Sequence, residues 1–390
     1  MASDLGAHLE ASAEANNVPS DQYLQQLLQQ CPDTASATSE LKRLSEHAFD
    51  SSTYQETQLA PETRFAQYID RRSQGEPLEY ILGSTPWAGL DILCRSGTLI
   101  PRESSEIVAS NFARTLAQLQ SEGVTKPAVP VRIADIGTGT GCVSLLLHKS
   151  LHPPDSTAPS GQSLEILGGD ISSDCLKLAS DNLEQAVRVG AVSSSARDDI
   201  SFQFLDMIKL GEAVSQLDKH ITPSTIKTSD ATSMSFLDHK WDAMISYPPC
   251  VPAADFLPGG RVPYSDRTYQ PKVAIVPPVL ADGAMQELEV DPADVFFYIL
   301  LKVALKAEIK VTVLEVCEGP QATRVRKLAA RLMPSDAWIE RWRDEMVFAG
   351  DGLAESDLVD VNDDAVRGRA VVMWTGDWAE WRRKNPRNVA

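Results

Sequence analysis

Apolar residues recur at helical spacing near the start of the chain. Between Asp21 and Ile81 they stand three or four positions apart with polar residues between them, as in Tyr23-Leu24-Leu27-Leu28 and Phe65-Tyr68-Ile69. This spacing is typical of helices that bury one face, so we predict a small helical bundle over this range. The turn-rich segment from Gly83 to Glu103 has alternating apolar residues, which predicts a short hairpin.

The pattern changes after Pro130 to short apolar, β-branched runs separated by helical segments. The runs are VRIADIG, LEILGGDIS, SFQFLD, WDAMISY, EIKVTVLEV and RAVVMWT. Strands that alternate with helices form βαβ units and a largely parallel sheet. The sequence therefore predicts an α/β fold preceded by a helical domain. A chain of 390 residues suits two domains, since domains usually hold about 100 to 200 residues.

We place the predicted boundaries in the turn-rich region. Residues 1–84 form the N-terminal helical domain, residues 85–129 a hairpin and helix linker, and residues 130–390 the α/β domain. Residues 152–163, 193–199 and 210–239 read as surface insertions, and we expect the long polar run in the last of them to lack a fixed structure.

Charge and composition exclude several functional classes. The formal net charge of −18 argues against binding a nucleic acid, because such binding depends on Lys and Arg releasing counterions. The six cysteines contain no C-x-x-C pair, which suggests neither a zinc knuckle nor a disulfide framework and favours a reducing compartment. No apolar stretch is long enough to span a membrane, and the acidic N-terminus resembles no targeting signal. We expect a cytoplasmic protein, with a nuclear location as the alternative.

The segment DIGTGTG, Asp135 to Gly141, follows an apolar strand and precedes an apolar helix. Glycines let the backbone turn sharply and approach a ligand closely. A dinucleotide-binding turn would read G-x-G-x-x-G, whereas here G-x-G-x-G follows an acidic residue, which favours S-adenosylmethionine over a nicotinamide cofactor. The alternative is a tight turn without a ligand. The candidate cofactor-binding residues in this loop are Asp135, Gly137, Thr138, Gly139 and Gly141.

Two further acidic residues close the next two predicted strands. Asp170, followed by Ile171, is placed to accept hydrogen bonds from the ribose hydroxyls of the cofactor, and the alternative is a cap of the following helix. Asp206 is the candidate for receiving the adenine amino group. The fourth strand ends in ISYPPC, where two prolines fix the direction of the chain and of the Tyr247 and Pro248 carbonyls. The alternative there is a stiff loop without a ligand.

With these pieces in order, the chain resembles the HemK/PrmC family, which methylates the side-chain amide of a glutamine in peptide release factors. The matching segments are GEPLEYILG, LIPRESSE, DIGTGTGC, DIS, YQPKVAI, DG (Asp282, Gly283) and LEVCEGPQA. The resemblance implies a seven-stranded Rossmann-like class I methyltransferase sheet, S-adenosyl-L-methionine as cofactor, and a helical N-terminal domain that holds a protein acceptor such as a release factor. It also implies acceptor contacts from Arg102, Pro249 and Cys250, with Tyr247 and Pro248 at the reaction centre.

One departure affects the acceptor. The family signature is NPPY, and this chain has Tyr247-Pro248-Pro249-Cys250. The Tyr247 hydroxyl lies further from the backbone than an Asn carbonyl would, and Cys250 offers no aromatic face. The acceptor therefore stays open between glutamine and a different side chain or small molecule, and a catalytically inactive cofactor-binding protein is the further alternative. The histidines show no ligand spacing, so we predict no catalytic metal, and the C-terminal tryptophans indicate no site.

Overall fold

The computed structural model describes residues 20–50, 59–126, 129–154, 163–218, 231–280, 286, 289–343 and 368–385. The acidic N-terminal stretch, the DG pair Asp282 and Gly283, and the middle of two predicted insertions (155–162 and 219–230) lie outside these residues. The chain divides into two compact units. One comprises residues 1–85, 94–96 and 262–270, and the other comprises residues 86–93, 97–261 and 271–390.

The first unit confirms the predicted helical bundle. Its helices are α2 (Ser20–Leu28), α3 (Thr34–Phe49), α5 (Pro61–Ser73) and α6 (Leu78–Leu82), and the short α13 (Tyr264–Tyr269) belongs to the same unit. Helix α3 begins at Asp33, whose carboxylate accepts a hydrogen bond from the Ser36 amide at 2.7 Å, and this satisfies one of the amides that a helix start leaves open. Apolar side chains from the helices share one buried core, which includes Tyr23, Leu27, Leu41, Leu44, Phe65 and Ile69.

The predicted hairpin is confirmed as a two-stranded sheet of β1 (Ser84–Trp87) and β2 (Leu90–Leu93). The turn between them places both Ala88 and Gly89 at positive φ, 51° and 66°. A two-residue hairpin turn in which both central residues have positive φ has a backbone twist that matches the twist of the flanking strands. An alanine in this conformation is strained, whereas glycine adopts it freely.

The second unit contains a seven-stranded sheet, counted over the described residues, in the order β5-β4-β3-β6-β7-β9-β8. All six predicted runs are strands: β3 (Val131–Ile136), β4 (Leu164–Asp170), β5 (Ile200–Phe204), β6 (Ala243–Ser246), β7 (Val311–Glu315) and β9 (Gly368–Trp374). The first five are parallel, and β9 runs antiparallel to β7. The seventh strand, β8 (Trp338–Arg343), pairs antiparallel with β9 and was not among the predicted runs.

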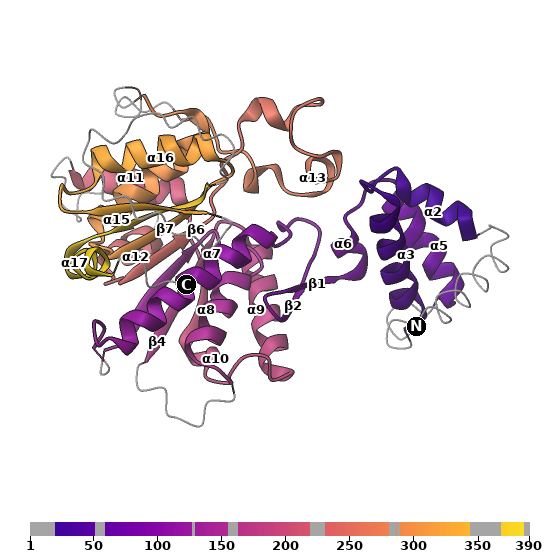
Figure 1. Cartoon of the computed structure of the whole chain (residues 1–390), viewed down its shortest axis with the longest axis horizontal. Coiled ribbons are helices and arrows are strands. Elements are labelled where there is room, and N and C mark those ends of the chain that lie inside the picture. Colours follow the sequence, from indigo (N-terminus) through magenta and orange to yellow (C-terminus); the bar gives the residue numbers. More distant parts are fainter. Residues whose placement is uncertain are drawn as a thin grey trace. The chain divides into compact units, whose positions relative to one another are not determined.

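Helices cover both faces of this sheet (Figure 1). One buried cluster joins the sheet to α7 (Glu103–Ser121), α8 (Cys142–Leu151), α9 (Ser173–Arg188), α10 (Ala196–Asp199) and α17 (Gly376–Lys384). A second cluster joins the other face to α11 (Met207–Asp218), α12 (Ala231–Asp238), α15 (Val295–Lys306) and α16 (Gly319–Leu332). Short 3₁₀ turns occupy Ala253–Phe256, Lys272–Ala274 and Pro292–Asp294. The α/β prediction is confirmed as a three-layer arrangement.

Helices α11 and α12 correct one expectation. Residues 210–239 were predicted to lack a fixed structure, yet the described ends of this range are helical, and the apolar side chains of Leu210, Val214, Phe236 and Leu237 are buried against the sheet. The polar composition of the middle of the range obscured these flanking apolar positions. Residues 193–199 likewise include α10, with Ala196 fully buried.

Within the described helices, we find none that combines the length and the apolar composition needed to cross a membrane.

The missed strand β8 carries a buried charge that organises this end of the sheet. Glu340 is 2% exposed and accepts hydrogen bonds from three indole N–H groups, those of Trp338, Trp342 and Trp374, at 3.2, 3.0 and 3.2 Å. Its Oε2 also pairs with Nε of the buried Arg382 at 3.0 Å. Trp342 and Trp374 are therefore core residues that donate to the same carboxylate as the partly buried Trp338.

Changing Glu340→Gln tests this interpretation. The substitution removes the charge that faces Arg382 and puts an amide N–H₂ opposite groups that only donate, so we expect a loss of about 3–5 kcal/mol in the free energy of unfolding. The exposed pair Glu308–Lys240, with side chains 78% and 77% exposed at 3.2 Å, provides the control, and Glu308→Gln should change stability by less than about 1 kcal/mol. Urea unfolding of both variants measures the difference, and equal effects would contradict the role assigned to Glu340.

Candidate functional site

The glycine loop forms a strand-to-helix turn with three left-handed glycines. Gly137, Gly139 and Gly141 have φ of 78°, 55° and 77°, a conformation that glycine adopts without strain. A Cβ on Gly141 would lie 2.9 Å from Cβ of Ala179, so this glycine lets α9 pack closely. A Cβ on Gly139 would meet nothing within 4 Å, and one on Gly137 would meet only the Tyr247 carbonyl oxygen at 3.9 Å. The loop therefore borders open space at Gly137 and Gly139.

Asp135 lies beneath the loop. Its side chain is 3% exposed, and Oδ2 accepts hydrogen bonds from the hydroxyls of Thr138 at 2.8 Å and Ser144 at 2.7 Å. Burial raises the pKa of this carboxyl to about 6, although the two hydroxyls act in the opposite direction. The geometry gives Asp135 and Thr138 a supporting role, since both are occupied in shaping the turn.

Asp170 ends β4 beside the same loop. Its Oδ2 accepts a hydrogen bond from the Gly139 amide and its Oδ1 from the Ser172 amide, both at 2.9 Å. The cap of α9 is Ser172, whose hydroxyl accepts from the Cys175 amide at 3.3 Å, so the helix-capping alternative for Asp170 is not what the structure shows. Burial raises the pKa of Asp170 above its ordinary value. Each carboxylate oxygen retains a second lone pair for a ligand hydroxyl.

Asp206 has a local task at the start of α11. Its Oδ1 accepts hydrogen bonds from the Ile208 amide at 2.9 Å and the Lys209 amide at 3.4 Å. Two apolar side chains near these strand ends remain accessible, since Ile171 is 46% exposed and Phe204 is 43% exposed. The role of Asp206 toward adenine stays a prediction, and Phe204 is a candidate that the sequence reasoning missed.

The tetrad Tyr247 to Cys250 follows β6. Ser246, the last residue of that strand, donates its hydroxyl to the Ile136 carbonyl at 2.7 Å and so fixes the end of β6 beside β3. The amides of Cys250 and Val251 both donate to the Ile275 carbonyl, at 3.1 and 3.0 Å. Ile275 closes the motif YQPKVAI, which therefore holds the tetrad from its other side. Pro248 is buried and Pro249 is half-buried.

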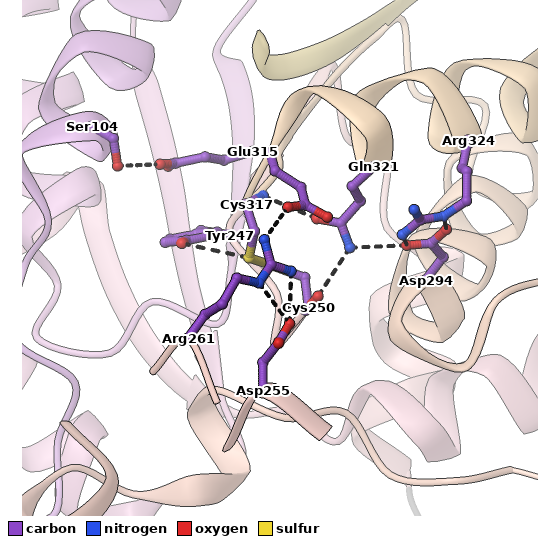
Figure 2. The surroundings of a disulfide bond; sticks show 11 residues. Ser104, Tyr247, Cys250, Asp255, Arg261, Asp294, Glu315, Cys317, Gln321 and Arg324 are labelled. Carbon is purple, nitrogen blue, oxygen red and sulfur yellow. Dashed lines mark hydrogen bonds and ion pairs between the residues drawn. A yellow bond between two sulfur atoms is a disulfide. The ribbon is translucent and has the colours of Figure 1, made fainter. Parts of the chain in front are cut away.

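A disulfide between Cys250 and Cys317 corrects the expectation of unpaired cysteines (Figure 2). The two Cα atoms lie 6.5 Å apart, at a sequence separation of 67. Cys250 follows β6 and Cys317 follows β7, and these strands are parallel neighbours. Spacing along the chain gave no sign of the pair, because the proximity arises only when the sheet forms.

The Tyr247 side chain points toward this disulfide. Its hydroxyl oxygen lies 3.9 Å from Sγ of Cys317 (Figure 2), and its ring packs against the apolar cluster under α15 and α16. The residue at the Asn position of the family signature therefore directs its polar atom toward the neighbouring loop.

Gln321 braces the two cysteines and was missed by the sequence reasoning. Its Oε1 accepts a hydrogen bond from the Cys317 amide at 2.9 Å, and its Nε2 donates to the Cys250 carbonyl at 3.0 Å (Figure 2). The same Nε2 donates to Oδ1 of Asp294 at 2.9 Å, and Arg324 pairs with Oδ2 of Asp294 at 2.6 Å. Gln321 is 1% exposed. The only sequence signal was its position within LEVCEGPQA.

Ion pairs of Arg261 and a hydrogen bond from Ser104 hold the chain on either side of the disulfide. Arg261 pairs with Asp255 at 2.6 Å and with Glu318 at 2.5 Å, so it links the segment after the tetrad to the residue after Cys317.

Ser104, in the motif LIPRESSE, donates its hydroxyl to Oε1 of the buried Glu315 at 2.9 Å at the end of β7. Arg102 of the same motif precedes α7, and its carbonyl accepts the Trp87 indole N–H at 2.9 Å. Its proposed acceptor contact stays a prediction.

The chain is similar in sequence to release factor glutamine methyltransferases. It is 32% identical over 160 residues to the enzyme of Haemophilus influenzae, a match that covers 41% of this chain and 53% of that protein. It is 28% identical over 205 residues to the probable MRF1 mitochondrial N(5)-glutamine methyltransferase mtq1 of Schizosaccharomyces pombe, with 53% of each chain covered. The chain spans about half the length of these curated relatives. No family model matches it. The resemblance to this group of methyltransferases is confirmed.

Among solved structures, the chain is similar to the human methyltransferase 10 domain containing protein. The alignment covers 74% of this chain and 90% of the human protein, with a TM-score of 0.38 and 14% identity. The fold assignment rests on the strand order given above.

Breaking the Cys250–Cys317 disulfide should lower stability. In the chain-entropy model, a crosslink with a separation of 67 residues contributes about 4 kcal/mol. We expect the Cys250→Ser/Cys317→Ser variant to unfold at a lower urea concentration than the wild type under non-reducing conditions, and the difference to disappear when a dithiol reductant is present. Cys94→Ser/Cys142→Ser, at two other buried cysteines, is the control in which reductant should not close the gap. A wild type indifferent to reductant would contradict the bond.

Proposed function

We propose that the chain is an S-adenosylmethionine-dependent methyltransferase whose cofactor site is the glycine loop together with Asp170. The observation that carries the proposal is the meeting of three strand ends. The Gly139 amide after β3 binds the Asp170 carboxylate at the end of β4, and the Tyr247 carbonyl after β6 faces Gly137. Open α/β sheets bind ligands at this edge, where the strand order reverses. The sequence similarity to named methyltransferases supports the same conclusion.

In this proposal each residue has a distinct task. Asp170 accepts hydrogen bonds from the ribose hydroxyls, and the exposed side chains of Ile171 and Phe204 flank the adenine, with Asp206 near its amino group. Gly137 and Gly139 leave room for the ligand because a Cβ at either would project into the open space. Asp135 and Thr138 hold the loop in shape from below.

The chemistry is a displacement at carbon. When bound, the cofactor supplies a methyl group on sulfonium; a bond from the acceptor atom to this methyl forms as the carbon–sulfur bond breaks, its electron pair stays on sulfur, and the acceptor loses a proton to solvent. The protein contributes mainly by holding the acceptor in line, since correct orientation provides much of the acceleration in such transfers. Pro248 and Pro249 suit this task because they stiffen the acceptor loop.

We propose a protein side chain as the acceptor class, with a release factor as the candidate partner. Relatives named for glutamine methylation support a protein acceptor. The net charge of −18 disfavours a nucleic acid acceptor. A cytoplasmic location stays a prediction, with the nucleus as its alternative.

The tetrad supports a second candidate function, cofactor binding without turnover. Tyr247 points its hydroxyl toward Cys317, and Cys250 is held in the disulfide. Neither side chain therefore provides the carbonyl acceptor or the aromatic face of an NPPY tetrad. Loss of one preorganised polar contact lowers a rate by about 100- to 1000-fold, so glutamine methylation in particular should be slow.

Calorimetric titration with S-adenosylmethionine tests the cofactor site. We expect the wild type to bind in the micromolar range and Asp170→Ala to weaken binding by about 10- to 100-fold, since hydrogen bonds to a charged group contribute about 1.5–3 kcal/mol. Asp174→Ala removes an exposed carboxylate from the first turn of α9 and serves as the control, which should bind like the wild type. A wild type that binds no cofactor would end the proposal.

Methyl transfer to a glutamine-containing release factor peptide tests the acceptor. We expect Tyr247→Asn/Cys250→Tyr to methylate the peptide about 100-fold faster than the wild type, because it restores the polar contact and the aromatic face. Cys250→Ser is the matched control, since it opens the disulfide without restoring the tetrad. A wild type as fast as the double variant would show that YPPC serves glutamine. No transfer by either protein to this peptide or to cell-extract proteins, with binding intact, would favour the second candidate.

A further inference from the structure

Two histidines and an aspartate converge at the C-terminal end of α8. His148 and His152 are four residues apart, on the last turn of α8 and at its cap, and Asp199 ends α10. Oδ2 of Asp199 lies 2.9 Å from Nε2 of His148 and 3.3 Å from Nδ1 of His152. The three atoms lie within 4.8 Å of one another. Two histidines at i and i+4 on one helix face are a spacing that binds zinc, so the expectation that the histidines show no ligand spacing is wrong for this pair. The third member, Asp199, comes from a distant helix and could not be assigned from spacing.

The cluster is built on a buried imidazole. His148 is 0% exposed, and its Nε2 lies 2.9 Å from Oδ2 of Asp199 and 3.4 Å from the Ser195 hydroxyl oxygen. Within the described residues its Nδ1 has no hydrogen-bond partner. Nε2 is therefore the ring atom that faces the cluster. The two imidazoles are the ion-pair partners found for Asp199 among the described residues.

We propose that His148, His152 and Asp199 bind a zinc ion. Zinc takes imidazole nitrogen and carboxylate oxygen at about 2.0–2.2 Å in tetrahedral geometry, which separates ligand atoms by about 3.3 Å. The two distances to Asp199, 2.9 and 3.3 Å, are close to this spacing. The imidazole rings cross at 80°, so they are not stacked, and the third separation, between the two ring nitrogens, is at most 4.8 Å. The side chains of His152 and Asp199 are 9% and 18% exposed, which admits a water as fourth ligand.

The histidine cluster lies away from the glycine loop that we propose to bind the cofactor. Helix α8 begins after Gly141 at the glycine loop and rises about 1.5 Å per residue, so the histidines lie at the opposite end of the helix from the cofactor loop. Asp199 directly precedes Ile200, the first residue of β5. The ion would therefore fix α10 and the start of the edge strand β5 to α8.

Zinc binding to the full chain is the direct test. After dialysis against a chelator, we expect titration with Zn²⁺, followed by competition with a chromogenic chelator, to give one tightly held ion per chain. We expect saturating zinc to raise the melting temperature by about 5 °C or more. His152→Gln and Asp199→Asn should each remove this ion and this shift, and both positions are less buried than His148. Circular dichroism of the metal-free variants verifies that they remain folded.

His239→Gln is the matched control, because His239 also contacts a carboxylate, that of Glu165 at 3.1 Å, without a second imidazole. This variant should bind zinc like the wild type. Absence of a tightly held ion from the wild type, or equal binding by His152→Gln and Asp199→Asn, would overturn the proposal and leave a hydrogen-bonded cluster. The readouts are independent of cofactor binding and of transfer activity.

Discussion

The parallel backbone register of four central strands is the constraint on which the candidate site depends. Asp135 pairs with Gly168 on one side and with Ile245 on the other, and Ile245 pairs with Val313. Hydrogen bonding between parallel strands therefore brings the ends of β3, β4, β6 and β7 to one edge. The glycine loop, Asp170, the tetrad and Cys317 are far apart in sequence, and they meet there because each follows one of these strands. Open sheets bind ligands at such an edge.

The sequence predicted those elements whose signal is local. Strand β3 and the glycine loop are adjacent in sequence, so Asp135 to Gly141 could be assigned from apolar pattern and glycine spacing alone. Strand β8 was missed because Trp338, Glu340 and Trp342 resemble no β-branched run, and their burial depends on Arg382 from a distant helix. The same limit applies to Gln321 and to Cys250–Cys317. Their partners are set by the sheet, and no spacing along the chain encodes them.

The loop that contains the tetrad Tyr247 to Cys250 is held by different contacts from those that hold the glycine loop. The cofactor loop owes its shape to backbone conformation and to Asp135 beneath it, both of which match the family pattern. The acceptor loop is held instead by the Cys250–Cys317 bond, by Gln321 and by Arg261. These contacts replace the polar and aromatic groups of NPPY with a crosslink that stiffens the loop.

Helix α8 connects the glycine loop with the cluster of His148, His152 and Asp199. Its N-terminus begins at Gly141, where the turn borders the open space, and its C-terminus carries His148 and His152 beside Asp199. Between these ends the apolar side chains of α8 pack in one buried cluster with α7 and the sheet. The buried Asp135 adds a polar contact at the first turn, since its hydrogen bond from Ser144 ties α8 to β3. The helix that follows the glycine loop is therefore held by polar contacts at both ends and by the apolar core between them.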